Sequence, residues 1–236
     1  MSRFLLGLAL VAIALPAAAA DRSYTVTSFD RVRVEGPFDV RLTVANAGAS
    51  AKASGDPEVL TNLDIQVQGT TLIVRKGANG WSERGKTGGA APVITLVSSS
   101  LRTATVIGGG KLAVGGTIRS QRLDFQVNGT GSIDARGIAT DELYVGLVGA
   151  GNVALAGKSG RAQLQTNGSG TIMAMPLTVN DLIVRLDGTS ETQVSARFTA
   201  DLTSTGLGRI VVAGGAKCTA KAQAGGPILC GPDAKP

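Results

Sequence analysis

A Gly-x-Gly tripeptide recurs about every twenty residues through the second half of the chain. Its first glycines are spaced 21, 20, 19, 20 and 18 residues apart. Six copies in register exceed what a glycine-rich chain supplies by chance, and a fixed period of this length is typical of stacked repeats. The fifth copy departs from the pattern, because Ser190 stands where the others have a second glycine. The first glycines are Gly108, Gly129, Gly149, Gly168, Gly188 and Gly206, and the second are Gly110, Gly131, Gly151, Gly170 and Gly208.

Apolar residues alternate with small or polar residues on both sides of each tripeptide. Phe125 and Val127 precede Gly129, and Ile133 and Ala135 follow it, with polar residues such as Gln126 and Asp134 between them. A period of two predicts strands with one buried face, and no helical period competes with it. Equivalent aliphatic positions recur four residues after each first glycine, at Leu112, Ile133, Val153, Ile172 and Ile210, with Thr192 in the fifth copy.

One such unit cannot bury its apolar face alone, but stacked units can. The repeats therefore predict an all-β, single-stranded parallel β-helix, or solenoid, with rungs of about 20 residues. Six rungs at about 4.8 Å each would rise roughly 29 Å. Glycines 115–116, 137 and 157 predict a second corner. A β-sandwich is the alternative, although its hairpins would not keep a common register.

The first twenty residues have the pattern of a secretory signal peptide. Arg3 is followed by an apolar run over residues 4–15, then by Pro16 and a small-residue cleavage site over residues 18–20. A buried N-terminal helix is the alternative. No later apolar stretch approaches the roughly 20 residues of a membrane helix, so we expect a mature chain that starts at Asp21 and has no membrane span. Its predicted location is the periplasm, the extracellular medium or the cell surface.

The two cysteines, Cys218 and Cys230, predict one disulfide in an oxidising compartment. It would close a C-terminal cap or tail over residues 216–236, beyond a β-helix domain of residues 21–215. Residues 77–92 interrupt the alternation, are rich in glycine and carry Trp81, so they predict an exposed loop. Trp81 is either a binding anchor or a side chain folded back against the wall of the helix.

The sequence lacks the residues that most catalytic sites require. The chain has no histidine, which removes Ser-His-Asp catalysis and histidine-ligated metals. Its basic residues are scattered singly, so nucleic-acid binding is poorly supported. We predict no catalytic residue, cofactor or metal ligand. A polysaccharide hydrolase needs two carboxylates at about 5–10 Å, and the outward candidates for such a pair are Asp124, Asp134, Asp141, Glu142, Asp181, Asp187 and Asp201.

Two long segments carry a family resemblance. FDRVRVEGPFDVRLTV (residues 29–44) and SGDPEVLTNLDIQVQGTTLIV (residues 54–74) resemble the opening of the putative auto-transporter adhesin, head GIN domain family, and the later Gly-x-Gly corners resemble its repeats. The resemblance covers roughly residues 28–214. It implies a right-handed β-helix, export and a role in adhesion, without established catalytic residues.

Three functions remain open from the sequence. The first is an exported, non-catalytic, adhesion-like module that binds a protein or polysaccharide surface. The second is a carbohydrate-active β-helix enzyme, and the third is a passive scaffold of the bacterial envelope. The ridged faces of a β-helix, with polar side chains at regular spacing, favour the first.

Overall fold

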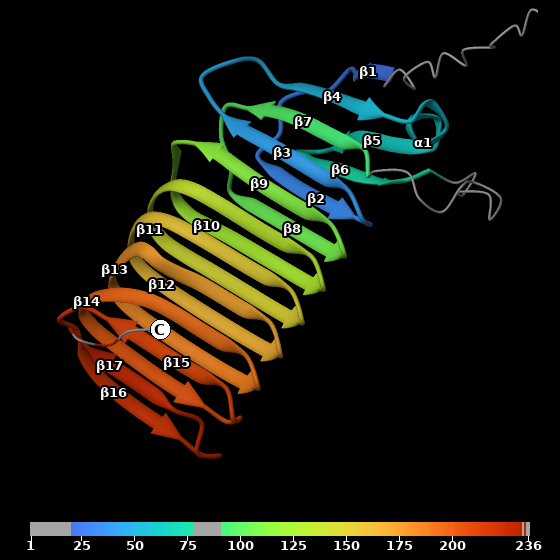
Figure 1. The fold of residues 1–236 in the computed structure, drawn as a ribbon. Coiled ribbons are helices and arrows are strands. Elements are labelled where there is room, and N and C mark those ends of the chain that lie inside the picture. The colour runs from blue at the N-terminus through green and yellow to red at the C-terminus, as the bar shows by residue number, and fades with distance from the viewer. Residues whose placement is uncertain (1–19, 78–90, 233, 235–236) are drawn as a thin grey trace, which may run out of the picture.

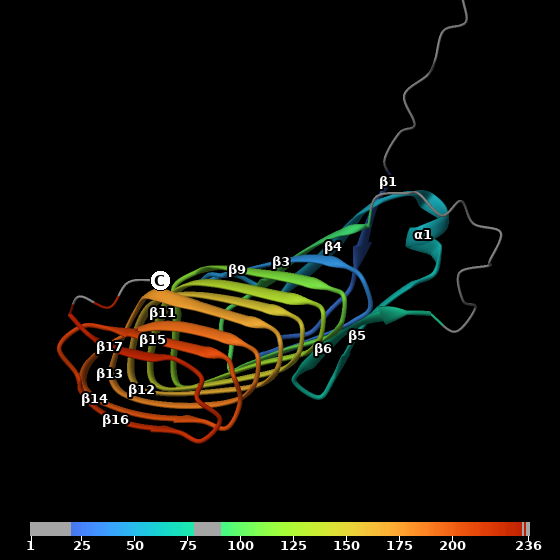
Figure 2. The ribbon, with the colours of Figure 1, turned by 60° about the horizontal axis from the view of Figure 1, so that its bottom comes forward.

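The computed structural model describes residues 20–77, 91–232 and 234, and they form one parallel β-helix (Figure 1). This confirms the predicted architecture and its period. Seen obliquely from one end, each coil is a flattened loop (Figure 2). The longest strands run round the far corner of a coil, so one strand supplies most of a turn. They are β10 (Ile118–Gly129), β11 (Ser132–Gly149), β12 (Asn152–Gly168), β13 (Thr171–Gly188) and β14 (Glu191–Ser204).

Each coil has three straight stretches, shown here on β11. The outbound stretch, residues 132–135, leaves the Gly-x-Gly corner. The corner stretch, residues 138–140, lies at the far corner, and the inbound stretch, residues 142–149, returns to the next Gly-x-Gly. Each stretch pairs in parallel with the same stretch of the next coil, apart from short register shifts at the far corner. Side chains at equivalent positions therefore form columns along the helix.

The inward columns make up the core. Ile133 is in register with Val153, and Val153 with Ile172, and all three are at most 1 % exposed. The inbound stretches add a second column that contains Phe125, Val145 and Leu164, each fully buried. Successive coils thus bury their aliphatic side chains against one another, as the alternation predicts.

The two glycines of each corner are needed for different reasons. Gly149 has a φ of +109°, a backbone conformation that side chains other than glycine rarely adopt. Gly151 has no such φ, but a Cβ there would lie 2.5 Å from the carbonyl oxygen of Gly131 and 2.7 Å from a methyl of Val127. The first glycine makes the turn, and the second lets the coils approach.

Ser190 shows how a corner can dispense with its second glycine. At other corners the Cβ of that glycine would strike the residue two before the previous first glycine, such as Val127 or Leu147. At the fifth corner that residue is Thr166, and the Ser190 hydroxyl donates a hydrogen bond of 2.9 Å to the Thr166 hydroxyl. Both side chains are buried. The Thr166 hydroxyl thus takes the place of the valine or leucine methyl that would exclude a side chain at the position of Ser190.

We therefore expect Thr166 and Ser190 to be energetically coupled. Thr166→Val should lower the free energy of unfolding by about 1–3 kcal/mol, because it leaves the buried Ser190 hydroxyl without its partner. Adding Ser190→Gly should restore part of that loss. A double-mutant cycle measured by thermal unfolding gives the coupling, and strictly additive effects of the two substitutions would contradict this account.

The first coils do not follow chain order. β2 (Arg31–Glu35) lies between β6 (Thr71–Lys76) and β8 (Thr103–Gly108), and β3 (Asp39–Val44) lies between β7 (Val93–Ser98) and β9 (Lys111–Gly116). From β2 onward, the chain therefore forms the second coil, leaves to build the first, and returns to build the third. β2 and β3 are hydrogen-bonded to other strands along both edges, which places this early segment inside the stack.

Antiparallel strands close the N-terminal end. β4 (Ser50–Gly55) pairs antiparallel with β7, β1 (Ala20–Tyr24) with β4, and β5 (Leu63–Gln68) with β6. One short helix, α1 (Pro57–Thr61), lies in this region, where the sequence showed no helical period. The Asp56 carboxylate caps it by accepting from the Glu58 amide at 2.8 Å. Five residues are too few to show a helical period in the sequence.

The C-terminal strands continue the stack of coils. β16 (Lys217–Ala222) pairs with β14, and β17 (Ile228–Gly231) pairs with β15 (Arg209–Ala213). The predicted disulfide between Cys218 and Cys230 is confirmed. Cys218 is in register with buried Ala200, and Cys230 with buried Val212. The disulfide therefore joins the two sides of the last coil at inward positions.

Removing this disulfide should loosen the last coil and spare the middle of the helix. The variant Cys218→Ser with Cys230→Ser should lose about 3 kcal/mol of local stability, by loop-entropy arguments. In a repeat fold each unit contacts only its neighbours, so amide hydrogen exchange should accelerate in β16 and β17 and stay slow in β11 and β12. Uniform acceleration along the chain would contradict this local role.

Candidate functional site

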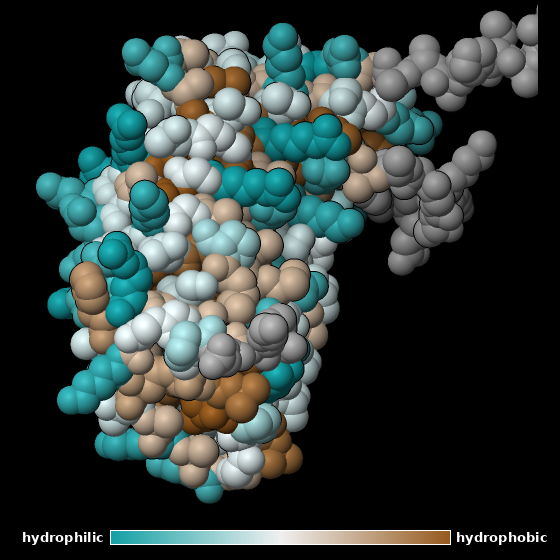
Figure 3. Space-filling view, turned by 60° about the vertical axis from the view of Figure 1, so that its left-hand side comes forward, coloured by the Kyte–Doolittle hydropathy of each residue, from teal (hydrophilic) through white to brown (hydrophobic). Residues whose placement is uncertain are grey.

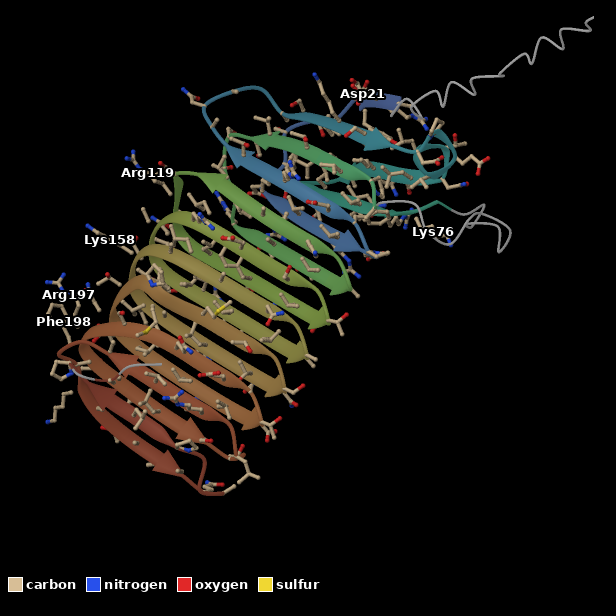
Figure 4. The ribbon with its side chains drawn as sticks, viewed as in Figure 1. Asp21, Lys76, Arg119, Lys158, Arg197 and Phe198 are labelled. Atoms are coloured by element: carbon tan, nitrogen blue, oxygen red, sulfur yellow. A yellow bond between two sulfur atoms is a disulfide. The ribbon has the colours of Figure 1, made fainter. Side chains whose placement is uncertain are left out.

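The inbound stretches present a flat outer face of regularly spaced polar side chains, best seen with the sticks of Figure 4. Strand pairing puts one residue of each coil in every outward column. Two columns cross the middle of this surface, which we call the inbound face. The first holds Asp124, Tyr144, Gln163, Ile183 and Asp201, and the second holds Gln126, Gly146, Gln165, Arg185 and Thr203.

Tyr144 is the aromatic residue of these columns. Its hydroxyl donates to the side-chain oxygen of Gln165 at 3.2 Å, one coil further on. A Cβ added to Gly146 would lie 3.5 Å from the Tyr144 ring, so the ring lies beside backbone without a side chain. Burial raises the pKa of Tyr24, the other tyrosine, but that residue lies at the N-terminal end of the helix. Tyr144 and Gln165 thus combine an aromatic surface with a polar partner.

A shallow depression of about 170 Å³ lies next to this pair, toward the glycine corner. Gln165, Asn167, Arg185, Asp187 and Thr205 are among the residues that line it. The Thr205 hydroxyl donates to the Asp187 carboxylate at 3.2 Å. Pockets for small molecules usually measure about 300–1,000 Å³, so this depression suits one substituent of a larger ligand.

The carboxylates considered for a hydrolase are spread over several columns, and no two of them occupy adjacent coils of one column. Asp124 and Asp201 share a column four coils apart, and Asp134 lies on the outbound side, where it pairs with Arg136 at 3.2 Å. This pairing raises the pKa of Arg136. Asp141 lies at the far corner and Asp187 borders the depression.

Glu142 and Asp181 are the remaining acidic candidates. They share one column, two coils apart, with Arg161 between them. Two interstrand spacings are about 10 Å. The arginine therefore lies where a hydrolase would hold the bond that it cleaves.

The remaining site predictions concern Trp81, metal ligands and membrane spans. Trp81 lies outside the described residues. Among the residues that the structure describes, no group of three or more His, Cys, Asp or Glu side chains is placed to hold a metal ion. In that same part of the chain, no helix has the length and apolarity to cross a membrane. Tyr144 and Gln165 were not predicted as site residues from the sequence, although both positions can be counted from the glycines, five residues before Gly149 and three before Gly168.

The hydropathy of the far-corner side is mixed. Figure 3 shows mostly hydrophilic and neutral residues there, with a hydrophobic area toward the C-terminal end. Met173 and Leu229, both partly exposed, belong to one outbound column. The polar inbound face therefore differs in character from this C-terminal part of the outbound side.

Sequence comparison gives one family match. A family model described as putative auto-transporter adhesin, head GIN domain, matches residues 28–216. A search of curated proteins found no match.

Solved structures share the fold at low sequence identity. A putative adhesin from Bacteroides fragilis is 20 % identical with a TM-score of 0.82, covering 91 % of this chain and 97 % of its own. A putative adhesin from Parabacteroides distasonis is 15 % identical with a TM-score of 0.73, covering 91 % and 97 %. A putative lipid binding protein from the same species is 18 % identical with a TM-score of 0.70, covering 92 % and 95 %.

Proposed function

The chain belongs to the putative auto-transporter adhesin, head GIN domain family, and from that premise we propose that it is an exported binding module that adheres to a polysaccharide surface without catalysing a reaction. The observation that carries the proposal is the inbound face. Its two columns carry polar side chains on most coils, about 4.8 Å apart, and are interrupted by Ile183 and Gly146. Tyr144 and Gln165 lie on neighbouring coils within them. A long polymer can contact several coils of such a surface at once.

Three further observations support binding over catalysis or a passive role. Arg161 separates Glu142 from Asp181, the acidic candidates that share a column at the shortest coil separation. The family match and the solved neighbours carry the names of adhesins and of a binding protein. The Cys218–Cys230 disulfide is typical of an oxidising compartment outside the cytosol, which agrees with the signal peptide predicted over residues 1–20.

A surface ligand fits the fold better than a lipid held inside it. Aliphatic and aromatic side chains such as Phe125, Leu164 and Ile172 fill the interior of the middle coils and are fully buried. The depression on the inbound face is small and open to solvent. We therefore assign the binding role to the outer faces.

The test combines a glycan array with cell adhesion. The chain from residue 21 to residue 236 is applied to the array, and a deletion strain is compared with strains carrying the wild type or Tyr144→Ala. We expect glycan binding, an adhesion defect on deletion, and weaker binding by Tyr144→Ala. Met173→Ala, at an exposed position on the outbound side, is the control and should behave as wild type.

Two results would defeat the proposal. One is an absence of both glycan binding and an adhesion defect. The other is release of reducing ends from the bound polysaccharide, since that would identify an enzyme.

A further inference from the structure

We infer that the far corner carries a second binding surface, a row of unpaired cations that holds a linear acidic polysaccharide. The inference rests on the proposed binding function and names a ligand class for a different part of the molecule. The row consists of Arg119, Lys158 and Arg197, which project from the same side of the helix (Figure 4). We call these three residues the basic edge.

Strand pairing fixes the spacing of the basic edge. Arg119 is in register with Ala139, and Ala139 with Lys158, so the two cations are two coils apart. Two interstrand spacings are about 10 Å. Lys158 is in register with Thr178, and Arg197 follows in the next coil, at a register shift between β13 and β14. All three side chains are exposed.

The neighbouring column shows what a structural charge ladder looks like in this fold. Arg122, Glu142, Arg161 and Asp181 follow one another in register, so each cation has an acid on the adjacent coil. Opposite charges on adjacent strands stabilise pairing. The basic edge has neutral Ala139 and Thr178 in the places where that ladder has acids.

The cations of the basic edge are left without acidic partners. The ion pairs within 4.0 Å among the described residues include none of Arg119, Lys158 and Arg197, and none between the ladder residues. The two columns therefore differ in register, since the ladder has acids next to its cations and the basic edge has neutral residues there. Strand pairing therefore does not account for these charges, and they remain available to an anionic ligand.

An exposed aromatic side chain lies at one end of the row. Phe198 is 57 % exposed, and the Arg197 guanidinium lies 5.4 Å from the centre of its ring. A fully apolar ring at an exposed position gives the folded chain little, since burial is what stabilises such a side chain. Beside a cation, it can pack against the apolar face of a sugar whose carboxylate the arginine binds.

A polar depression lies at the other end. It has a volume of about 320 Å³ and is lined by Val44, Ala45, Asn46, Ser99, Thr117 and Arg119. Asn46, Ser99 and Thr117 offer both hydrogen-bond donors and acceptors, as hydroxyl-rich sugars require. The basic edge thus runs from a polar depression, past Lys158, to a cation with an aromatic ring.

The spacing favours an acidic polysaccharide over the other polyanions. Each strand of a DNA duplex carries a charge about every 3.4 Å, much closer than the spacing of the cations here. Binding to anionic membranes typically uses clusters of four to eight basic residues, whereas this row has three separated ones. A polysaccharide with one carboxylate on every second sugar has sparse, regular charges of the kind that the row can match.

The experiment compares immobilised hyaluronan, a linear polymer with alternating uronic acids, with neutral dextran. Wild-type chain is expected to bind hyaluronan, more weakly as salt rises. The triple variant Arg119→Gln, Lys158→Gln, Arg197→Gln should bind about tenfold more weakly, the combined loss of three exposed charge contacts. Its control is Lys52→Gln, Lys111→Gln, Lys221→Gln, which removes the same charge from other exposed positions and should bind within about twofold of wild type.

Phe198→Ala supplies a second readout that leaves the net charge unchanged. It should weaken hyaluronan binding while the dependence on salt stays the same, because the ring contributes packing and no charge. Equal binding by the wild type and the triple variant would overturn the inference, as would equal loss in the control triple. Tighter binding to phosphatidylglycerol vesicles than to hyaluronan would also overturn it.

The two proposals fail in different ways. Binding to neutral glycans that Tyr144→Ala weakens, without any binding to hyaluronan, would remove the basic edge and keep the proposed function. Loss of all glycan binding and of the adhesion phenotype would remove the proposed function itself.

Discussion

Replacing Gly149 with alanine is expected to lower the free energy of unfolding by about 2–5 kcal/mol. Two effects add. The backbone at Gly149 has a φ of +109°, and an added Cβ would lie 2.6 Å from the carbonyl oxygen of Gly129 on the preceding coil. Relief requires that two paired coils move apart, which weakens the inward columns on both sides of the corner.

The matched control is Gly215→Ala. A Cβ at Gly215 has no atom of another residue within 4 Å, and its backbone has no positive φ, so the change should lie within about 0.5 kcal/mol. Guanidinium unfolding followed by circular dichroism compares the two variants. Equal unfolding midpoints would show that the corner does not limit coil stacking as described.

The second large loss of stability is expected when a buried phenylalanine is replaced by alanine, and the same replacement at an exposed phenylalanine is its control. Phe125→Ala should lower the free energy of unfolding by about 3–5 kcal/mol, because it removes a fully buried ring and leaves a cavity between coils. Phe198→Ala should change it by less than about 0.5 kcal/mol, since that ring is 57 % exposed.

The same unfolding experiment tests this pair. The wild type and Phe198→Ala should have the same unfolding midpoint, and the midpoint of Phe125→Ala should be much lower than both. A strong loss of stability in Phe198→Ala would mean that its ring supports the far corner, and it would remove the reason to treat Phe198 as part of a binding surface.

The regular coils were predictable because their rules are local. A corner glycine is needed where a Cβ would strike the preceding coil, as at Gly151, so the glycines mark the Gly-x-Gly corners of the regular coils in the sequence. Period-two alternation then assigns the inward side of each stretch. Together these two patterns give the register of residues such as Ile133 and Val153 without any structure.

The N-terminal coils were not predictable in the same way. Alternation identifies β2 as a strand but does not say what it pairs with. Its partners β6 and β8 lie on either side of it in space, and both come later in the chain. No Gly-x-Gly spacing links these segments, so the interleaved order depends on long-range packing that the local pattern does not carry.

The candidate surfaces were only partly visible in the sequence. The basic residues were interpreted as scattered singly, whereas three of them line the far corner. Arg119 and Lys158 each stand ten residues before a first glycine, and Arg197 stands nine before Gly206. That signal was present, but register shifts at the far corner make counting from the glycines less reliable there than on the inbound face.

The stacking of coils, which places both proposed surfaces, is tested most directly by distances along one outward column. Spin labels at Asp124, Gln163 and Asp201, introduced in pairs through cysteine, lie in register on the inbound face. Asp124 to Gln163 should measure about 10 Å and Asp124 to Asp201 about 19 Å, two and four interstrand spacings, apart from the length of the labels. Distances that fail to grow with the number of coils would contradict the account.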